Sequence, residues 1–496
     1  MAHHKPNIIL ISMDTVRQDH LSCYGYHRMT TPNIDRIARH GVLYENAFSA
    51  APWTPPSHAS IFTGKYPSHH KTLGKDIRFK KENTSIAEIL NQAGYQTIGL
   101  TCCQILGHGS EFERGFDEYF ELREPSLSDI KNLNRSILKD LARTMIYGSD
   151  EGTFQATQMI KSSLTRIQKS EKPFFLFVNY FSCHTPYDPP RHFKQRFCKE
   201  FSEKESYVKK ILLKTLLGSK FGGSPGKQTS LRKLRWIANG GGGFSFAAGQ
   251  ITISKEEWEI VKAWYDAEIA YLDYNLGNLF HFLQSENIYD NTFVVITSDH
   301  GENFGEHGLA VHPLCLYDTL LRVPLIISCP SLIPEGRRIP SLVSTIDIFP
   351  TLLDISKTQS FEEDIQGRSL FPFDDRRIHD FICAEYGGLH TQGFGGLKAW
   401  NLTPATKKGL LKIDKGCKCI RDSTYKYILW ADKQELYNIS NDPQETVNIA
   451  HKNPRIVESL REKMEKTIDI SYFGPHKLPV DGKQKAIDRL KALGYI

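Results

Sequence analysis

The sequence predicts an α/β fold: a large, mostly parallel sheet covered by helices on both faces, with a smaller C-terminal α+β subdomain. Its apolar segments are continuous runs rather than alternating ones, which is typical of strands buried on both faces. Segments with a helical apolar pattern separate these runs, and this alternation builds a doubly covered sheet. A chain of 496 residues is also long enough to bury a large core and to form two or three domains.

The expected elements follow in chain order. The runs that predict buried parallel strands are 7–14, 173–184, 292–300 and 321–328. The helical patterns cover 31–42 and 255–286. After about residue 375, short strand-like pieces broken by glycine-rich turns replace the long runs, and a helical pattern follows at 454–468. We therefore expect an α/β domain over 1–375 and an α+β subdomain over 376–496.

Residues 204–249 interrupt this pattern and are interpreted as an insertion. The stretch 204–235 carries nine Lys and Arg against one acid, and four consecutive glycines follow at 240–243. Its first part can form a basic amphipathic helix. Two interpretations remain open: a solvated helix with a mobile loop, or a lid that recruits an anionic or lipid-like substrate.

Composition limits the classes of function. Charged residues make up 24% and hydrophobic residues 40% of the chain, ordinary values for a soluble globular protein. The net charge of +6 permits an anionic substrate but is far from a nucleic-acid-binding signature. No apolar run approaches the roughly 20 residues of a transmembrane span, and no export signal precedes residue 7. We expect a cytoplasmic protein without a transmembrane segment.

Polar side chains stand at the carboxyl ends of three expected strands. Asp14 ends the first, His184 ends the second, and Asp299 with His300 ends the third. Ligands of open α/β sheets bind at this edge, so these side chains are expected to converge. Two carboxylates and an imidazole are a suitable ligand set for a divalent cation such as Mn²⁺, Zn²⁺, Mg²⁺ or Ca²⁺.

Thr54 opens the segment TPPSHASIFTG, and two prolines follow it directly. Proline is favoured in the first turn of a helix, which places Thr54 at or near a helix N-terminus. One interpretation is a threonine that only caps the helix. The other is a nucleophile, because helix N-termini attract anions and a neighbouring metal ion would make the hydroxyl easier to deprotonate. The candidate metal ligands favour the nucleophile.

Further histidines are candidates for the same site. His58 follows Thr54 by one helical turn, and His312 follows the Asp299 loop. With His184, they are expected to hold a transferable oxyanion, to protonate a leaving group or to ligate a second metal; the alternative for each is a structural role. His20 and His307 are expected to be structural.

Motifs along nearly the whole chain resemble the sulfatase family of the alkaline-phosphatase superfamily, and they occur in the family's order. The segments that carry the resemblance are NIILISMDTVRQDHLSCYGY, TPNIDRIARHGVLYENAFS, TPPSHASIFTGKYPS, ITSDHGENFGEHG, LYDTLLRVPLII, STIDIFPTLLDI, ELYNISNDPQETVNIA and LKALGYI. The resemblance implies the alkaline-phosphatase-like fold and an ester hydrolase.

The chain departs from the family pattern at its nucleophile. A formylglycine sulfatase has Cys or Ser at the head of CxPSR, whereas Thr54 stands there and His58 replaces the arginine. Threonine cannot become formylglycine. His312 replaces the family's substrate-gripping lysine, and a GKWH-like segment is absent around 100–104.

The metal-binding motifs differ as well. The family's first Asp pair is Asp14-Thr15 here, and its Asp-Asn pair is Asp299-His300. With Thr54, these residues are similar to the metal set of threonine-nucleophile phosphotransferases such as lipoteichoic-acid synthases and phosphoethanolamine transferases. Nucleotide pyrophosphatase/phosphodiesterases share the set but add an Asp-His-His site. The resemblance implies one divalent ion on Asp14, Thr54, Asp299 and His300, and no formylglycine.

The expected function is therefore a metal-dependent hydrolase of sulfate or phosphate esters. Thr54 attacks the ester, while His184, His58 and His312 grip the oxyanion or protonate the leaving group. Phosphate and phosphonate esters are favoured over sulfate, because a threonine ester can be released only by attack on its central atom. The expected substrate is a small-molecule, glycan or lipid-head-group anionic ester. A group transferase and a catalytically inactive binding protein are the alternatives.

Overall fold

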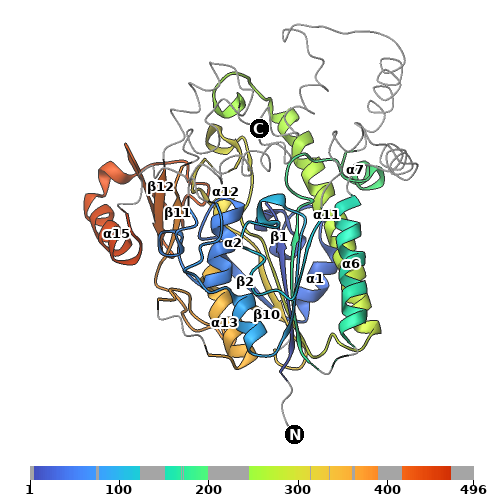
Figure 1. The fold of residues 1–496 in the computed structure, drawn as a ribbon. Coiled ribbons are helices and arrows are strands. Elements are labelled where there is room, and N and C mark those ends of the chain that lie inside the picture. Colours follow the sequence, from blue (N-terminus) through green and yellow to red (C-terminus); the bar gives the residue numbers. More distant parts are fainter. Residues whose placement is uncertain are drawn as a thin grey trace.

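The computed structural model describes residues 5–73, 77–122, 151–168, 170, 172–198, 245–312, 314–333, 336–359, 364–388 and 416–470. Figure 1 shows a large central sheet between two groups of helices, with a smaller sheet and helix beside it. Most of the expected 204–249 insertion, including its basic helix, lies outside the described residues.

The central sheet has eight strands in the order β10-β2-β9-β6-β1-β5-β3-β4. Its strands are β1 (Asn7–Met13), β2 (Val42–Phe48), β3 (Gln96–Thr101), β4 (Glu118–Glu121), β5 (Phe174–Tyr180), β6 (Thr292–Thr297), β9 (Leu325–Ser328) and β10 (Arg337–Ser344). The predicted strands at 7–14, 173–184 and 292–300 are the central neighbours β1, β5 and β6, and β1 pairs in parallel with both others. The mostly parallel sheet is confirmed.

The fourth predicted parallel strand is wrong in its direction. β9 runs antiparallel to both of its neighbours, β6 and β2. Between β6 and β9 the described residues form the small hairpin of β7 (Asn303–Phe304) and β8 (Ala310–Val311), a 3-10 helix at Glu306–Gly308 and the short helix α12 (Asp318–Leu321). A parallel return needs a crossover connection, whereas an antiparallel return does not. The apolar run at 321–328 indicated burial on both faces but not direction.

Helices cover both faces of the central sheet, as predicted (Figure 1). Along β1, Ile9 and Ile11 pack into a cluster with α1, α6 and α11, whereas Ile8 and Leu10 pack into a cluster with α2, α4 and α13. The helices are α1 (Pro32–Arg39), α2 (Thr54–Thr63), α3 (Pro67–His70), α4 (Ile86–Gln92), α6 (Glu151–Ile167), α7 (Arg191–Phe197), α11 (Lys255–Ser285), α13 (Ile348–Ser356) and α15 (Pro454–Thr467). Short 3-10 helices cover Gln18–His20, Ser22–Tyr24, Gln104–Leu106, Glu306–Gly308, Thr345–Asp347 and Ala450–Lys452.

Helix ends follow local sequence signals. α11 begins after Ser254, whose side chain accepts a hydrogen bond from the Glu257 amide while the Glu257 side chain accepts one from the Ser254 amide. This reciprocal pair satisfies two amides that a helix end leaves open.

The predicted helices at 31–42 and 255–286 correspond to α1 and α11. Within the described ranges no helix is both long and apolar enough to cross a bilayer.

The C-terminal part forms an antiparallel sheet of four strands with α15 packed on it. Its strands are β11 (Ile382–Tyr386), β12 (Cys417–Arg421), β13 (Tyr425–Trp430) and β14 (Gln434–Asn438), in that order. The α+β character expected for this region is confirmed. The exact boundary near residue 375 stays a prediction.

A buried ion cluster joins this subdomain to the central domain. Lys426 on β13 is fully buried and contacts Asp318 of α12 at 2.7 Å and Glu445 at 2.6 Å. Arg421 contacts the second oxygen of Asp318 at 2.6 Å. Burial acts to lower the pKa of Lys426, but the two carboxylates outweigh it and raise the pKa above its ordinary value. The cluster therefore fixes the chain just after the β7–β8 hairpin.

Replacement of Lys426 by Met tests this cluster. The change leaves the buried Glu445 oxygen without its cation, so we expect the free energy of unfolding in urea to fall by about 3 kcal/mol or more. Arg461→Ala removes an exposed helical pair with Glu465 and should cost about 0.5 kcal/mol or less. Equal losses in the two variants would contradict the anchoring role.

Candidate active site

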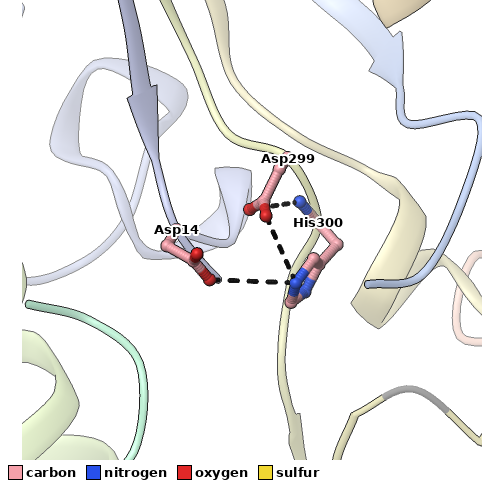
Figure 2. A group of neighbouring side chains, drawn as sticks. All are labelled: Asp14, Asp299 and His300. Carbon is pink, nitrogen blue, oxygen red and sulfur yellow. Dashed lines mark hydrogen bonds and ion pairs between the residues drawn. The ribbon is translucent and has the colours of Figure 1, made fainter. Parts of the chain in front are cut away.

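Three predicted ligands converge at the carboxyl edge of the central sheet. Asp14 follows β1, and Asp299 and His300 follow β6, which is hydrogen-bonded to β1. All three side chains are fully buried, and one ligand atom of each lies within 4.8 Å of the others. Figure 2 shows the two carboxylates and the imidazole pointing toward one another. Adjacent parallel strands therefore build this group directly.

The hydrogen bonds around the group leave the inward atoms for a ligand. His300 Nδ1 lies 2.9 Å from the Gly301 carbonyl, so Nδ1 carries the proton and Nε2 presents a lone pair. Nε2 lies 3.4 Å from Asp299 Oδ2 and 3.8 Å from Asp14 Oδ1. Asp299 Oδ1 accepts the amides of Thr15 and His300, at 3.2 and 2.9 Å.

The two remaining carboxylate oxygens have no hydrogen-bond donor. Asp14 Oδ1 and Asp299 Oδ2 are buried and receive no hydrogen bond from the described residues. Burying a carboxylate oxygen without a hydrogen-bond donor costs free energy. Two such oxygens beside the lone pair of an imidazole would also repel each other and that lone pair. A divalent cation satisfies all three atoms at once, so the residues fit a metal ion.

The electrostatics agree with this assignment. Burial, and then the charge of Asp299, raise the pKa of Asp14 well above its usual range. Asn179 on β5 donates weakly to Asp14 Oδ2, at 3.5 Å, and favours the charged form. Asn179 was not anticipated from the sequence; its only signal is its place near the end of a buried strand.

Thr54 lies beside the same group. It is the first residue of α2, one position after the cap, and its side chain is almost fully buried. Its Oγ1 lies 3.4 Å from His300 Nε2 and 3.5 Å from Asp14 Oδ2. The first turn of α2 thus presents a hydroxyl to the candidate metal site, at the end of a helix whose dipole favours negative charge.

His58 lies in a supporting position instead of the substrate-binding position expected from the sequence. Nδ1 lies 2.9 Å from the Thr54 carbonyl and Nε2 lies 3.0 Å from Ser12 Oγ. Nδ1 is also 3.6 Å from Asp299 Oδ2. Burial lowers the pKa of His58. Because both ring nitrogens contact protein atoms, we assign His58 to positioning Thr54 and Asp299.

His184 and His312 reach the site from two loops. The His312 ring lies 4.3 Å from the His300 ring and 5.0 Å from the His184 ring, measured between centroids. His184 stacks on Phe181 at 4.2 Å, and its Nδ1 is 2.6 Å from the Thr185 carbonyl. Burial lowers the pKa of both imidazoles well below the usual value, which favours their neutral forms.

The histidines expected to be structural lie in other contacts. His20 Nδ1 is 2.7 Å from Asp266 Oδ1, and the His307 ring stacks on Tyr317 with centroids 3.6 Å apart.

Hydrogen bonds from neighbouring residues hold the turns that carry Asp14 and Asp299. Thr15 has a φ of 61°, a strained value for a β-branched residue. Its hydroxyl donates to the Cys183 carbonyl at 2.6 Å, and its own carbonyl accepts the Tyr265 hydroxyl at 2.7 Å. Ser57 of α2 donates to the Asp299 carbonyl at 2.7 Å. The strained turn aims the Thr15 amide at Asp299.

Glu302 is a further buried residue next to the site. Its Oε1 lies 3.1 Å from His312 Nδ1, and its Oε2 accepts the Tyr187 hydroxyl at 3.0 Å. Burial raises the pKa of Glu302 to about 8, and the hydrogen bond from Tyr187 acts in the opposite direction. Neither residue was selected from the sequence, although Glu302 lies within the segment ITSDHGENFGEHG.

Several known proteins are similar to this chain. A sulfatase of Formosa agariphila is 25% identical, over 93% of this chain and 87% of that protein. An N-acetylglucosamine-6-O-sulfatase of Bacteroides thetaiotaomicron is 24% identical, over 94% of this chain and 87% of that protein. The crystal structure of a phosphonate monoester hydrolase of Agrobacterium radiobacter has a similar fold, with a TM-score of 0.69 and 21% identity, covering 93% of this chain and 95% of that one.

The family model described as Sulfatase matches residues 6–358, which is well over half of the chain. That range includes Asp14, Thr54, Asp299 and His300 and all eight strands of the central sheet. The chain therefore belongs to the sulfatase family.

Proposed function

We propose that this chain is a metal-dependent ester hydrolase in which Thr54 is the nucleophile, with phosphate or phosphonate esters favoured over sulfate esters. One observation carries the proposal. The Thr54 hydroxyl lies 3.4 Å from His300 Nε2 and 3.5 Å from Asp14 Oδ2, beside carboxylate oxygens that receive no hydrogen bond. Members of the sulfatase family are ester hydrolases, and Thr54 heads the helix at this position.

Each residue has a defined part in the proposed reaction. A divalent ion on Asp14, Asp299 and His300 supplies positive charge that favours a Thr54 alkoxide and the oxygens of the bound ester. Thr54 Oγ1 attacks the central atom, a bond forms to it, and the ester oxygen leaves with the electron pair of the broken bond. The positive end of the α2 dipole favours the transferred anion, and Thr54 supplies the one backbone N–H among the first three residues of the helix, because Pro55 and Pro56 have none.

The imidazoles of His184 and His312 complete the proposed site. Both are buried and neutral, and both have Nδ1 next to a protein acceptor. With Nδ1 as the donor, each neutral ring has a lone pair on Nε2, so we assign each to take up a proton there and then to donate it to the transferred group or to the leaving oxygen. His58 positions Thr54 through the hydrogen bond that its Nδ1 donates to the Thr54 carbonyl.

The preference for phosphorus over sulfur rests on how the covalent intermediate is released. A formylglycine hydrate can expel its sulfate by collapsing to an aldehyde, but a threonine ester has no such exit. Water must therefore attack the central atom, and positioning with charge stabilisation suffices for phosphorus. Proteins named for each chemistry are similar to this chain: a phosphonate monoester hydrolase and several sulfatases.

Two alternatives expected from the sequence remain as outcomes of the tests. A transferase would pass the group to an alcohol instead of water. An inactive binding protein would have no need of two buried carboxylate oxygens facing an imidazole lone pair. The substrate class that we propose is a small-molecule, glycan or lipid-head-group anionic ester, handled in the cytoplasm.

The ligand set also favours one class of metal. Ca²⁺ takes six to eight oxygen ligands and Mg²⁺ keeps several waters, whereas imidazole nitrogen suits Zn²⁺ and other transition metals. His300 supplies such a nitrogen, and Thr15 turns its hydroxyl away toward the Cys183 carbonyl. We therefore propose Zn²⁺ or Mn²⁺ in preference to Ca²⁺ or Mg²⁺.

Thr54→Ala tests the nucleophile. Metal-loaded wild type and variant are compared on aryl phosphate monoesters, phosphate diesters, phosphonates and sulfates, with and without an added alcohol. We expect wild type to hydrolyse the phosphorus esters and the variant to lose at least about 10³-fold in kcat, because no covalent step remains. Thr54→Ser should retain measurable activity. Sulfate turnover that exceeds phosphorus turnover would contradict the preference, and activity in Thr54→Ala would contradict the nucleophile.

Metal binding is tested without activity, by metal analysis and by the shift in melting temperature. We expect one Zn²⁺ or Mn²⁺ per chain, a larger thermal shift than with Ca²⁺ or Mg²⁺, and loss of binding in Asp14→Asn. Because burial and Asp299 raise the pKa of Asp14, bound metal must displace a proton. Apparent affinity should therefore rise with pH. Retention of the ion in Asp14→Asn, or affinity independent of pH, would contradict the site.

A further inference from the structure

Tyr265 is a buried residue of α11 to which the proposed reaction gives no part. Its side chain is fully buried, and its hydroxyl makes two hydrogen bonds to the backbone of the turn that follows β1. The hydroxyl donates to the Thr15 carbonyl at 2.7 Å and accepts the Arg17 amide at 2.8 Å. Burial raises the pKa of Tyr265 well above its usual range, so the hydroxyl keeps the proton that it donates. One hydroxyl therefore joins the two ends of the turn.

Three successive backbone amides of this turn donate to side chains of other segments. The acceptors, in chain order, are Asp299 Oδ1 for Thr15 at 3.2 Å, Ser298 Oγ for Val16 at 2.9 Å and the Tyr265 hydroxyl for Arg17 at 2.8 Å. Asp299 and Ser298 follow β6, whereas Tyr265 lies on a helix that covers the sheet. The position of the turn therefore depends on α11 as well as on the neighbouring strand.

The Tyr265 hydroxyl supports a strained conformation. Thr15 has a φ of 61°, a left-handed value that is costly for a β-branched residue. Two hydrogen bonds hold it there, one from its own hydroxyl to the Cys183 carbonyl and one from the Tyr265 hydroxyl to its carbonyl. The Tyr265 ring is itself confined, with centroids 4.9 Å from the Phe304 ring and 5.6 Å from the Tyr187 ring. Loss of the Tyr265 hydroxyl would therefore allow Thr15 to relax.

The conformation of Thr15 matters because its amide is one of two donors to Asp299 Oδ1. The other donor is the adjacent His300 amide, at 2.9 Å. With Oδ1 held by both amides, Asp299 Oδ2 lies 3.4 Å from His300 Nε2. A carboxylate that keeps only the amide of the next residue can rotate about its side-chain bonds, and Oδ2 is then no longer fixed. The orientation of a candidate metal ligand thus depends on a hydroxyl of α11.

We propose that Tyr265 is a positioning residue of the candidate metal site, whose hydroxyl keeps Thr15 in the left-handed conformation so that the Thr15 amide orients the Asp299 carboxylate toward the ion. The inference rests on the proposed function, because it takes an ion on Asp14, Asp299 and His300 as given. Residues that orient metal ligands typically contribute about 10- to 100-fold in metal affinity. Tyr265 should therefore determine how tightly the ion is held.

Tyr265→Phe tests this role, because it removes the hydroxyl and keeps the ring. Affinity for Zn²⁺ and Mn²⁺ is measured by titration against a competing chelator. The visible absorption of the protein loaded with Co²⁺ is recorded as well, since it reports how the ligands are arranged around that ion. We expect affinity about 10-fold below wild type and a changed Co²⁺ spectrum. A role in stability alone would lower the melting temperature and leave the spectrum as in wild type.

Tyr95→Phe is the matched control. Tyr95 is also buried, and its hydroxyl donates to the Pro6 carbonyl at 3.1 Å, just before the opposite end of β1. We expect this variant to lower the melting temperature about as much as Tyr265→Phe does, and to keep the metal affinity and the Co²⁺ spectrum of wild type. Equal changes of affinity in the two variants would mean that any lost buried hydroxyl weakens the site, and would overturn the role of Tyr265.

Thr15→Gly tests whether the hydroxyl acts through the turn. Glycine adopts a positive φ without strain, so this background needs the Tyr265 hydroxyl less. We expect Tyr265→Phe to lower metal affinity by about 3-fold or less in the Thr15→Gly background, against about 10-fold in wild type, a difference that a double-mutant cycle measures. The same loss in both backgrounds would contradict an action through Thr15.

Failure of the inference differs from failure of the proposed function. A wild type that binds the ion, with a Tyr265→Phe variant of equal affinity and unchanged spectrum, would overturn the role of Tyr265 and leave the proposed function standing. A wild type that binds no ion would overturn the proposed metal site and this inference together. Activity in Thr54→Ala would overturn the nucleophile, and the metal titrations would still decide on Tyr265.

Discussion

The repulsion between two buried carboxylates is the constraint on which the site depends. Asp14 Oδ1 and Asp299 Oδ2 receive no hydrogen bond from the described residues, and His300 Nε2 presents a lone pair 3.8 and 3.4 Å from them. Without a cation, the fold can only relieve this repulsion by protonating Asp14, whose pKa is raised by burial and by Asp299. A bound divalent ion would turn the same arrangement into an attractive one and would place positive charge beside Thr54.

The central sheet places Asp14 and Asp299 next to each other. β1 and β6 are parallel neighbours, so Asp14 and Asp299 leave the sheet at the same edge. The strained turn at Thr15 supplies an amide to Asp299, and Ser57 ties the Asp299 carbonyl to α2. Backbone strain of this kind persists only where surrounding contacts over-determine it, as Tyr265 and the Cys183 carbonyl do here. Thr54 and the candidate metal ligands are therefore positioned by one connected set of hydrogen bonds.

Much of the parallel core and of the candidate metal site could be predicted from the sequence, because local patterns indicate which segments are buried and where strands end. The runs that became β1, β5 and β6 indicated the parallel core, and their carboxyl ends located Asp14, Asp299 and His300. The direction of β9 could not be predicted, since its apolar run reports burial and the chain between β6 and β9 determines direction.

Residues that act through a partner distant in sequence were also beyond prediction. Glu302 contacts Tyr187, and Asn179 contacts Asp14, across separations of 115 and 165 positions. His58 shows the same limit in another form. The sequence places it one turn after Thr54, but which way its ring nitrogens face depends on Ser12 of β1.

A crystal structure of the metal-loaded protein with orthovanadate would test the central claim most directly, because vanadate adopts the five-coordinate geometry of phosphoryl transfer. The account predicts a vanadium atom bonded to Thr54 Oγ1 in an apical position, with one metal ion on Asp14, Asp299 and His300. Vanadate held without contact to Thr54, or a metal ion bound away from these three side chains, would contradict it.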